Sequence, residues 1–465
     1  MTSKKIYDIA VIGSGPAGEK AALEAASLKA RVVVIEKGYN PGGASIITGT
    51  IPSKSLRETV QDLNAIRQSE LSGLDANYNK KITINELMHR KKAVVSNRVN
   101  GIFQKYHENK IDYLYGEGTF KDCNTLKIIS NDGSAIEIQA KKFIIAVGTR
   151  PYHPPNVTFD GKHILDSDSI LTLDCIPEEM AVFGGGVIGS EYAFIFAKLG
   201  TKVHLIDPRG KILDFIDDQI SATLANLMEK CGIRLHLGCP FKTIKQSGDQ
   251  VDITFKNDKT LSVPVLLYAN GRQGLAENLN LESCGIKLNS RSQLDVNHNY
   301  QTTVPHIYGA GDIIGFPSLV SVSNEEGRLA ARHAVLNEEV SRIGADIPSA
   351  IYTIPEIASI GLSEKEIQEK GIPYETGICY FKDLARGYII GEKDGLLKLI
   401  FHRENRELLA VHVLGQSAAE LVHIGQVVIN MKGKLDYFID TVFNFPTLSS
   451  AYKVAAKDGL KKLQY

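Results

Sequence analysis

The sequence lacks an excess of charge of either sign. Its 465 residues include 53 Lys and Arg and 53 Asp and Glu, so the formal net charge is zero. Binding to nucleic acid or to an anionic membrane surface usually needs a basic excess, which is absent here. Long apolar runs are also missing, because the most apolar stretch, residues 181–200, contains Glu191, Lys198 and several glycines. We therefore expect neither a nucleic acid nor a membrane as a partner.

Cysteine is scarce and follows no functional spacing. The six cysteines form no C-x-x-C pair and no arrangement typical of a metal site. This pattern indicates scattered, reduced thiols in a cytosolic protein, and it predicts no bound metal. The basic residues at the start of the chain run directly into the glycine-rich segment described next, so we predict no cleaved signal peptide and a cytoplasmic location.

The segment from residue 7 to residue 36 has the pattern of a dinucleotide site. A short apolar strand at residues 7–12 is followed by a G-x-G-x-x-G turn, a helix over 17–29 and a second strand over 31–35. The glycines let the backbone approach a pyrophosphate, the helix N-terminus stabilises its charge, and an acid after the second strand binds the ribose. The residues in these roles are Gly13, Gly15, Pro16, Gly18 and Glu36.

A second copy of this pattern begins at residue 180. Its strand, glycine turn, helix and second strand place Gly184, Gly186, Ile188, Gly189 and the terminal acid Asp207 in the corresponding positions. Two complete units in one chain predict two dinucleotides bound together. The alternative is a duplicated fold in which one of the two sites is inactive.

Three further segments resemble motifs of the class I pyridine nucleotide-disulfide oxidoreductases, a flavoprotein family. They are residues 42–54, Gly148-Thr149-Arg150-Pro151 and Gly311-Asp312. The resemblance implies that the first unit binds FAD, the second binds NAD(H) or NADP(H), and a C-terminal domain forms a homodimer or a higher homo-oligomer. Beyond the first glycine turn, the FAD-binding residues that it implies are Gly43, Ser45, Thr50, Lys54, Gly148, Gly311 and Asp312.

The expected fold class is α/β, with two Rossmann-like dinucleotide-binding domains and an α+β C-terminal domain. The FAD-binding domain is expected to be discontinuous, over residues 1–153 and 280–345. The NAD(P)-binding domain is expected over 154–279 and the dimerisation domain over 346–465. The C-terminal part shows strands at 396–402 and 408–414 and helices at 418–431 and 449–463, with no third nucleotide signature.

The family's disulfide chemistry is missing from this sequence. Ser45 and Thr50 stand where disulfide reductases carry two redox cysteines, and Phe445 and Ser450 replace the histidine base and its glutamate. Phenylalanine cannot transfer a proton, so the dithiol, the base and its orienting acid are all missing, and we do not expect reduction of a disulfide substrate. What the resemblance retains is hydride transfer between a nicotinamide and the flavin. It also implies that Lys54 lies beside the flavin and pairs with Glu191, whereas the residues alone would favour a solvated lysine and a surface glutamate.

Several stretches are similar to the soluble transhydrogenases within this family, including Gly49-Thr50-Ile51-Pro52-Ser53-Lys54 and residues 351–357 and 443–447. Those proteins tend to keep the first cysteine, where this chain has Ser45. We expect a ping-pong transhydrogenase, in which a second pyridine nucleotide removes the hydride at the site where the first delivered it. Two alternatives stay open: an NAD(P)H:quinone reductase or diaphorase, and a non-catalytic flavoprotein that senses redox state.

The sequence leaves the choice of nucleotide open. Asp207 favours NAD(H), because it accepts from a ribose 2′-hydroxyl and repels a 2′-phosphate. Arg209 and Lys211 follow closely and favour NADP(H). Together with Gly271, these residues predict a site that tolerates both nucleotides, although Arg209 is also compatible with a solvated loop charge.

Overall fold

The computed structural model describes residues 6–67, 83–341, 343–344 and 346–463, which fold as two units. The first unit comprises Met1–His153, Ser167–Asp174 and Gly271–Ile343, and the second comprises Pro154–Asp166, Cys175–Asn270 and Gly344–Tyr465. The chain therefore leaves the first unit and returns to it. Among these residues, the structure contains no helix that is long and apolar enough to cross a membrane.

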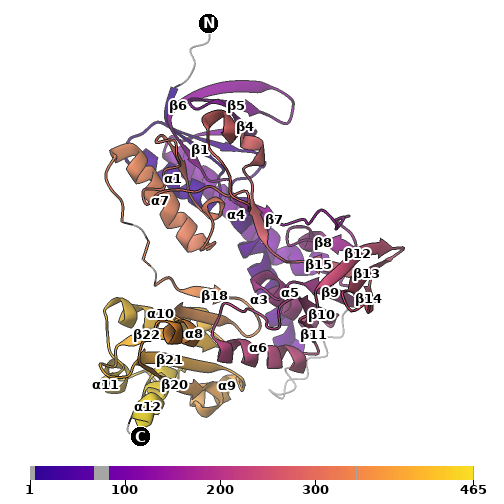
Figure 1. Ribbon diagram of the computed structural model, residues 1–465, viewed down its shortest axis with the longest axis vertical. Helices are drawn as coiled ribbons and strands as arrows, with labels where there is room; N and C mark the ends of the chain where they lie inside the picture. Colours follow the sequence, from indigo (N-terminus) through magenta and orange to yellow (C-terminus); the bar gives the residue numbers. More distant parts are fainter. Residues whose placement is uncertain (1–5, 68–82, 342, 345, 464–465) are drawn as a thin grey trace. The chain divides into compact units, whose positions relative to one another are not determined.

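A parallel sheet forms the centre of the first unit (Figure 1). Its strands lie in the order β3–β2–β1–β6, with β17 on the other side of β6, and all of these pairs are parallel. The bounds are β1 Ile6–Ile12, β2 Val32–Glu36, β3 Asp112–Tyr115, β6 Ala135–Ile145 and β17 Ile307–Gly309. The strand β6 also pairs with β5 (Thr125–Ile129), which pairs with β4 (Glu117–Asp122), so the three strands form an antiparallel meander.

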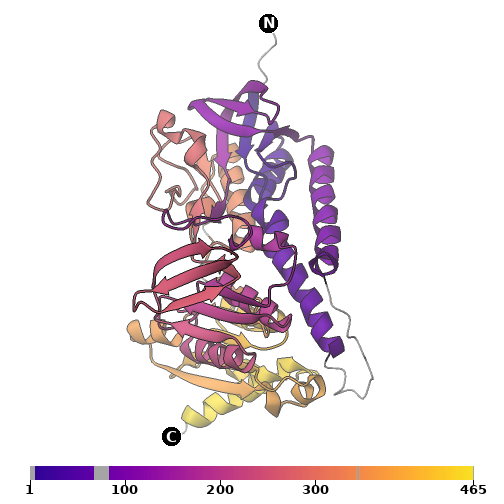
Figure 2. The same ribbon diagram turned by 90° about the vertical axis from the view of Figure 1, so that its right-hand side faces the viewer.

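Helices cover one face of this sheet. The small residues of α1 (Pro16–Ser27) let it pack closely against α7 (Val320–Leu336), and both contribute to one apolar core. The long helix α4 (Ile84–Glu108) joins the same core and also contacts α3 (Thr50–Arg67), as Figure 2 shows. A short helix, α2 (Gly43–Ile47), lies within residues 42–54, the first of the three segments that resemble family motifs.

The second unit contains the other Rossmann-like sheet. Its parallel strands lie in the order β11–β10–β9–β15–β8. The bounds are β8 Ile164–Leu165, β9 Glu179–Phe183, β10 Lys202–Asp207, β11 Arg234–Leu237 and β15 Val265–Tyr268. Helices α5 (Val187–Lys198) and α6 (Asp218–Lys230) follow β9 and β10, so the strand–turn–helix–strand pattern of the first unit is repeated.

Three antiparallel strands follow in the chain: β12 (Phe241–Ser247), β13 (Gln250–Phe255) and β14 (Thr260–Val263). The strand β14 ends at Val263, and β15 begins at Val265. Pro264 stands between them and lacks the N–H that a continuous ladder needs.

The C-terminal part of the second unit is an antiparallel sheet in the order β18–β19–β22–β21–β20. The bounds are β18 Ser349–Ile351, β19 Ile357–Gly361, β20 Tyr374–Tyr380, β21 Leu396–His402 and β22 Leu408–Leu414. Helices α10 (Ala418–Asn430) and α12 (Ala451–Leu463) pack on it and share its apolar core. Two Rossmann-like sheets with an α+β C-terminal part confirm the predicted fold class.

Candidate functional site

The first glycine turn connects β1 to α1. A Cβ atom added at Gly18 would lie 1.9 Å from the carbonyl oxygen of Gly13, so only glycine lets the helix pass this close to the turn. The helix begins at Pro16 with Gly15 as its N-cap, and no side chain of the described residues caps it. The first N–H groups of α1 are thus left for an anionic ligand, as a pyrophosphate requires.

Glu36 is tied to this turn by hydrogen bonds. Its Oε2 accepts from the backbone N–H (2.9 Å) and the hydroxyl (2.6 Å) of Ser14, and its Oε1 accepts from the N–H of Gly38 (2.8 Å). The carboxylate remains partly exposed and keeps lone pairs for ribose hydroxyls. Ser14 was missed by sequence reasoning, and its position between the first two glycines was the available signal. Its hydroxyl also accepts from the N–H of Gly42 at 3.2 Å.

Three predicted FAD-binding segments meet at the start of α1. A Cβ atom at Gly43 would lie 2.8 Å from Cα of Gly15, and one at Gly311 would lie 2.9 Å from Cβ of Ala17. The third segment contains Gly148 and contacts the second through its next residue, Thr149. The hydroxyl of Thr149 donates to Oδ2 of Asp312 at 3.3 Å. This narrow cradle of backbone and small side chains fits a bound dinucleotide such as FAD.

Asp312 is held by groups that the sequence did not reveal. Its Oδ1 accepts from the hydroxyl of Ser323 on α7 at 3.3 Å. Arg272 then fixes Thr149, because its Nε donates to Oγ1 of Thr149 at 2.9 Å and its Nη2 to the carbonyl oxygen at 2.8 Å. These contacts orient the Asp312 carboxylate toward one edge of the cradle. No short motif marks Ser323, which lies on α7, 11 positions after Asp312.

The segment that corresponds to the family's redox loop is helical. Ser45 lies on α2 and donates through its hydroxyl to the carbonyl oxygen of Gly42 at 3.3 Å. Thr50 is the first residue of α3 and is exposed. Lys54 follows one turn later, half-buried, with Nζ 3.5 Å from the hydroxyl of Ser53. The hydroxyl groups of Ser45 and Thr50 cannot form a disulfide.

The second glycine turn repeats the geometry of the first. A Cβ atom at Gly189 would lie 1.8 Å from the carbonyl oxygen of Gly184, which matches the close approach of Gly18 to Gly13. Gly186 is the N-cap of α5, again with no side-chain cap among the described residues. Ile188 lies in the first turn of α5 and is half-buried. The N-terminus of α5 therefore has the same capacity for a pyrophosphate.

The carboxylate of Asp207 is less accessible to a ribose hydroxyl than that of its counterpart Glu36. Its side chain has no exposed surface, and its oxygens accept from Gly185 N–H and from Arg209 through N–H (2.7 Å), Nε (2.9 Å) and Nη2 (2.8 Å). Burial opposes ionisation, but the hydrogen bonds from Arg209 keep the pKa of Asp207 below its usual range. The group that reaches the surface here is Arg209, whose side chain is 41% exposed.

Two more ion pairs lie in the segment that follows β10, and Arg209 makes one of them. Its Nη1 donates to Asp214 at 2.6 Å, and Lys211 pairs with Asp218 at the start of α6. Hydrogen bonds to Asp207 raise the pKa of Arg209 further, so the guanidinium stays charged. Arg209 and Lys211 therefore place two cations in the segment that follows the second unit's terminal acid, each of them paired with carboxylates.

Glu191 lies on α5 and is 4% exposed, so its interpretation as a surface glutamate is wrong. Its Oε1 accepts from the backbone N–H of Tyr352 at 2.9 Å, within the second unit. Lys54 belongs to the first unit, so the Lys54–Glu191 pair stays a prediction. Gly271 also falls in the first unit, where its carbonyl oxygen accepts from the N–H of Tyr152 at 3.1 Å.

The remaining predicted positions concern proton transfer and thiols. Phe445 is 75% exposed, and the hydroxyl of Ser450 donates to the carbonyl oxygen of Thr447 at 2.7 Å. All six cysteines are free thiols, as the sequence predicts. In the part of the chain that the structure describes, no group of three His, Cys, Asp or Glu residues is placed to hold a metal ion.

Comparison with known proteins gives matches along nearly the whole chain. The family described as pyridine nucleotide-disulphide oxidoreductase matches residues 7–327, and its dimerisation domain matches residues 347–456. Proteins named soluble pyridine nucleotide transhydrogenase are similar, at 40% identity for Colwellia psychrerythraea (98% of this chain and of that protein). The one from Marinobacter nauticus is 42% identical over 98% of this chain and 99% of that protein.

Two solved structures share the fold. LpdA from Mycobacterium tuberculosis has a TM-score of 0.89 at 26% identity, with 97% of this chain and 99% of that chain covered. The HOCl-induced flavoprotein disulfide reductase RclA from Escherichia coli has a TM-score of 0.86 at 25% identity, with the same coverage.

Proposed function

Because the chain belongs to the pyridine nucleotide-disulphide oxidoreductase family, we propose that it moves hydride between NADP(H) and NAD(H) as a soluble transhydrogenase. The family makes it a flavoprotein oxidoreductase with FAD and pyridine nucleotides as its cofactors. The observation that carries the proposal is the identity of 40–42% over 98% of the chain to proteins of that name. The dimerisation domain supports a homo-oligomer, and we place the protein in the cytoplasm.

The proposed domains follow the sequence prediction. Residues 1–153 and 280–345 bind FAD, residues 154–279 bind NAD(P)(H), and residues 346–465 form the dimerisation domain. The family implies that Glu36 and Asp312 hold the ribose and ribityl hydroxyls of FAD, with the α1 N-terminus at its pyrophosphate. Both carboxylates are partly exposed in the structure, which supports this role.

Bound FAD would supply the hydride acceptor and donor. The protein's own contribution is to hold the nicotinamide and to set the local charge. We assign Lys54 to the stabilisation of negative charge near the flavin, and Glu191 to the positioning of that lysine. Glu191 is buried and its Oε1 accepts from the N–H of Tyr352, so its carboxylate is held in a fixed position, which supports a positioning role.

The proposed mechanism is ping-pong and uses no disulfide. Ser45 and Thr50 occupy the positions of the redox thiols, so electrons have no thiol exit. The nicotinamide site is then both entrance and exit: one nucleotide delivers hydride and leaves, and a second removes it. Asp207 and Arg209 act as a pair in this shared site, because the guanidinium neutralises the acid that would otherwise repel a 2′-phosphate.

An anaerobic assay tests this proposal. Purified holoenzyme is mixed with NADPH, and loss of the oxidised flavin absorbance is followed. Thionicotinamide adenine dinucleotide is then added, and its reduced form is detected at its own wavelength. We expect flavin bleaching, reoxidation and parallel lines in double-reciprocal plots. Bleaching without transfer to the analogue, but with rapid transfer to a quinone, would replace the proposal by the diaphorase alternative. Binding of FAD without bleaching would favour the redox sensor.

Two controls sharpen the assay. Alkylation of the exposed Cys175 with iodoacetamide should leave transhydrogenation unchanged, because no thiol takes part. Lys54→Met should slow flavin reduction, whereas Lys20→Met, an exposed lysine on α1, should not. Loss of activity on alkylation would contradict the thiol-free mechanism, and equal rates in the two lysine variants would remove the role assigned to Lys54.

A further inference from the structure

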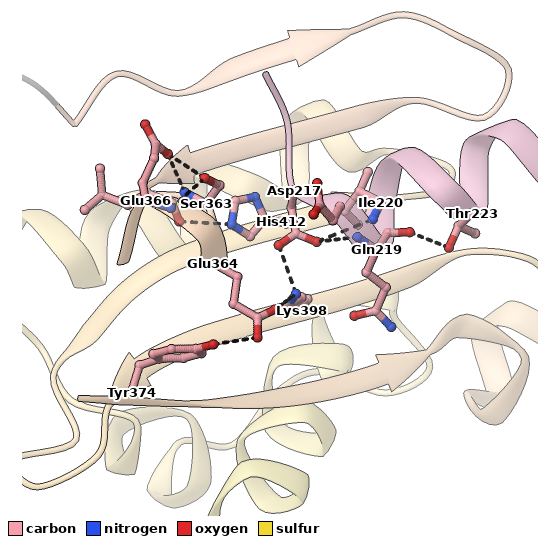
Figure 3. A network of polar contacts seen from close by, with 12 residues as sticks. Asp217, Gln219, Ile220, Thr223, Ser363, Glu364, Glu366, Tyr374, Lys398 and His412 are labelled. Atoms are coloured by element: carbon pink, nitrogen blue, oxygen red, sulfur yellow. Dashed lines mark hydrogen bonds and ion pairs between the residues drawn. The ribbon is translucent and has the colours of Figure 1, made fainter. Parts of the chain in front are cut away.

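A buried ion pair joins the C-terminal sheet to the start of helix α6, which follows the strand β10 (Figure 3). Lys398 lies on β21 with a side chain that is 2% exposed, and its Nζ donates to Oδ2 of Asp217 at 2.9 Å. The same ammonium group contacts Glu364, whose carboxylate also accepts from the hydroxyl of Tyr374 at 2.8 Å. Buried charges of this kind depend strongly on each other, because loss of one leaves the other unpaired.

Asp217 has a second set of contacts. It is the N-cap of α6, and its Oδ1 accepts from the N–H groups of Gln219 (3.1 Å) and Ile220 (3.4 Å). One carboxylate therefore holds the first turn of α6 with one oxygen and Lys398 with the other. The beginning of α6 is fixed to the C-terminal sheet at this point.

The 208–217 loop connects β10 to this anchored turn, and it carries Arg209 and Lys211. Its middle rests on the glycine turn, since the N–H of Leu213 donates to the carbonyl oxygen of Gly185 at 2.8 Å. The same middle part is tied to α6, because the hydroxyl of Ser221 donates to the carbonyl oxygen of Ile212 at 2.7 Å. A displacement of the first turn of α6 would therefore move the loop and the guanidinium on it.

The groups around the ammonium of Lys398 keep it protonated. Burial opposes ionisation of Lys398, but Glu364 and Asp217 raise its pKa above the ordinary value. His412 on β22 is 3% exposed, and burial lowers its pKa, so it is neutral at physiological pH. Lys398 is thus the charged side chain that donates directly to the Asp217 carboxylate.

We infer that Lys398 is a positioning residue for nucleotide choice: by holding Asp217, it fixes the 208–217 loop and thereby the affinity for the 2′-phosphate of NADP(H). This inference rests on the proposed function. Lys398 is buried, so it acts through the loop and not on the nucleotide. The effect is selective because NAD(H) lacks the 2′-phosphate and relies on the glycine turn, whereas NADP(H) also needs the cations of the loop.

The test is Lys398→Met, measured by anaerobic stopped-flow reduction of the flavin with NADPH and with NADH. We expect the apparent Kd of NADPH to rise between about 2-fold and 30-fold, the usual range for coupling through a packed network, with the Kd of NADH and both limiting rates unchanged. The matched control is Lys230→Met. Lys230 pairs with Asp394 at 2.8 Å and joins the opposite end of α6 to the same C-terminal region, but with both side chains exposed. It should change neither Kd.

Two further variants separate positioning from folding. Asp217→Asn combined with Lys398→Met removes both charges and keeps an N-cap acceptor, so it should fold and still bind NADPH more weakly. Arg209→Ala combined with Lys398→Met should lose less NADPH affinity than the sum of the two single losses, because both changes act in part on the same Arg209 contact.

The outcomes can be told apart. If the wild-type flavin is reduced by neither nucleotide, the proposed function fails and this inference with it. If the wild type accepts both nucleotides, the inference alone is overturned by equal changes in the two Kd values, by no change in Lys398→Met, or by the same selective effect in Lys230→Met.

Discussion

Replacing Arg209 with alanine should weaken NADP(H) and leave NAD(H) unaffected. A guanidinium has five N–H donors. In Arg209, Nε and one N–H of Nη2 are taken by Asp207 at 2.9 and 2.8 Å, and one N–H of Nη1 is taken by Asp214 at 2.6 Å. Two donors remain on the exposed edge for a 2′-phosphate. The alanine variant removes these donors and the positive charge, and it leaves the Asp207 carboxylate with backbone partners alone.

The size of the loss follows from these contacts. A hydrogen bond to a charged group contributes ~1.5–3 kcal/mol. The Arg209 side chain is 41% exposed, so solvent screening favours the lower end of that range. A loss of ~1.5 kcal/mol corresponds to about a 10-fold increase in the Kd of NADPH. NADH makes no such bond, and the freed carboxylate can accept its ribose 2′-hydroxyl, so its Kd should be unchanged or lower.

The measurement is flavin reduction as a function of nucleotide concentration, with NADPH and NADH in parallel. Asp214→Asn is the matched control, because it removes the exposed partner of Arg209 and keeps the guanidinium on Asp207. It should bind both nucleotides like the wild type. Retention of FAD and the midpoint of thermal unfolding show whether the alanine variant is folded. Equal weakening of both nucleotides in a folded Arg209→Ala protein would refute a contact with the 2′-phosphate.

Three other predictions concern the fold and its titrating groups. Gly18→Ala should purify with little flavin, because its Cβ would lie 1.9 Å from a carbonyl oxygen, whereas Gly101→Ala, with nothing within 4 Å, should keep its flavin absorbance. Burial raises the pKa of Cys379 to about 12, so at pH 8 iodoacetamide should label it far more slowly than the exposed Cys175; equal labelling by mass spectrometry would contradict this. Burial lowers the pKa of His412, so the unfolded chain takes up the proton first and the free energy of unfolding should fall below pH ~6.5, by at most ~1.4 kcal/mol per pH unit for this group. His412→Gln should show a shallower fall in urea titrations, and an unchanged slope would assign the effect to other histidines.

The sequence predicted the structure best at positions where the backbone geometry allows only one or a few residue types. Both glycine turns were located correctly, because the turns at Gly18 and Gly189 leave no room for a side chain. The strands at 396–402 and 408–414 were also predicted to the residue, since buried strands read as short apolar runs. These features are local, and their physical causes lie within a few positions of the residues concerned.

Contacts between distant segments could not be predicted in this way. Lys398 reaches Asp217 across 181 positions, with no periodicity or motif to mark the pair. Even the nearer contact of Ser323 on α7 with Asp312, 11 positions away, is marked by no short motif. Lys398 is especially unexpected, because a lysine in an apolar strand is normally placed on the solvent face. Its burial depends on two acids supplied by other elements, which only the assembled sheet brings together.

The two nucleotide units show how one motif can have two meanings. In both, the terminal acid accepts an N–H from the residue between the first two glycines and an N–H from the residue two positions beyond itself. The shared task of the acid is therefore to tie the glycine turn to the second strand. The two acids differ in the side chain that donates to their other lone pairs. At Glu36 this donor is the hydroxyl of Ser14, and at Asp207 it is the guanidinium of Arg209. Glu36 keeps room for a ribose, while the lone pairs of Asp207 are taken by its own chain. An acid at this position thus does not by itself indicate NAD(H); under the proposed function, we infer that the choice of nucleotide depends on the residue two positions later and on the contacts that hold that residue in place.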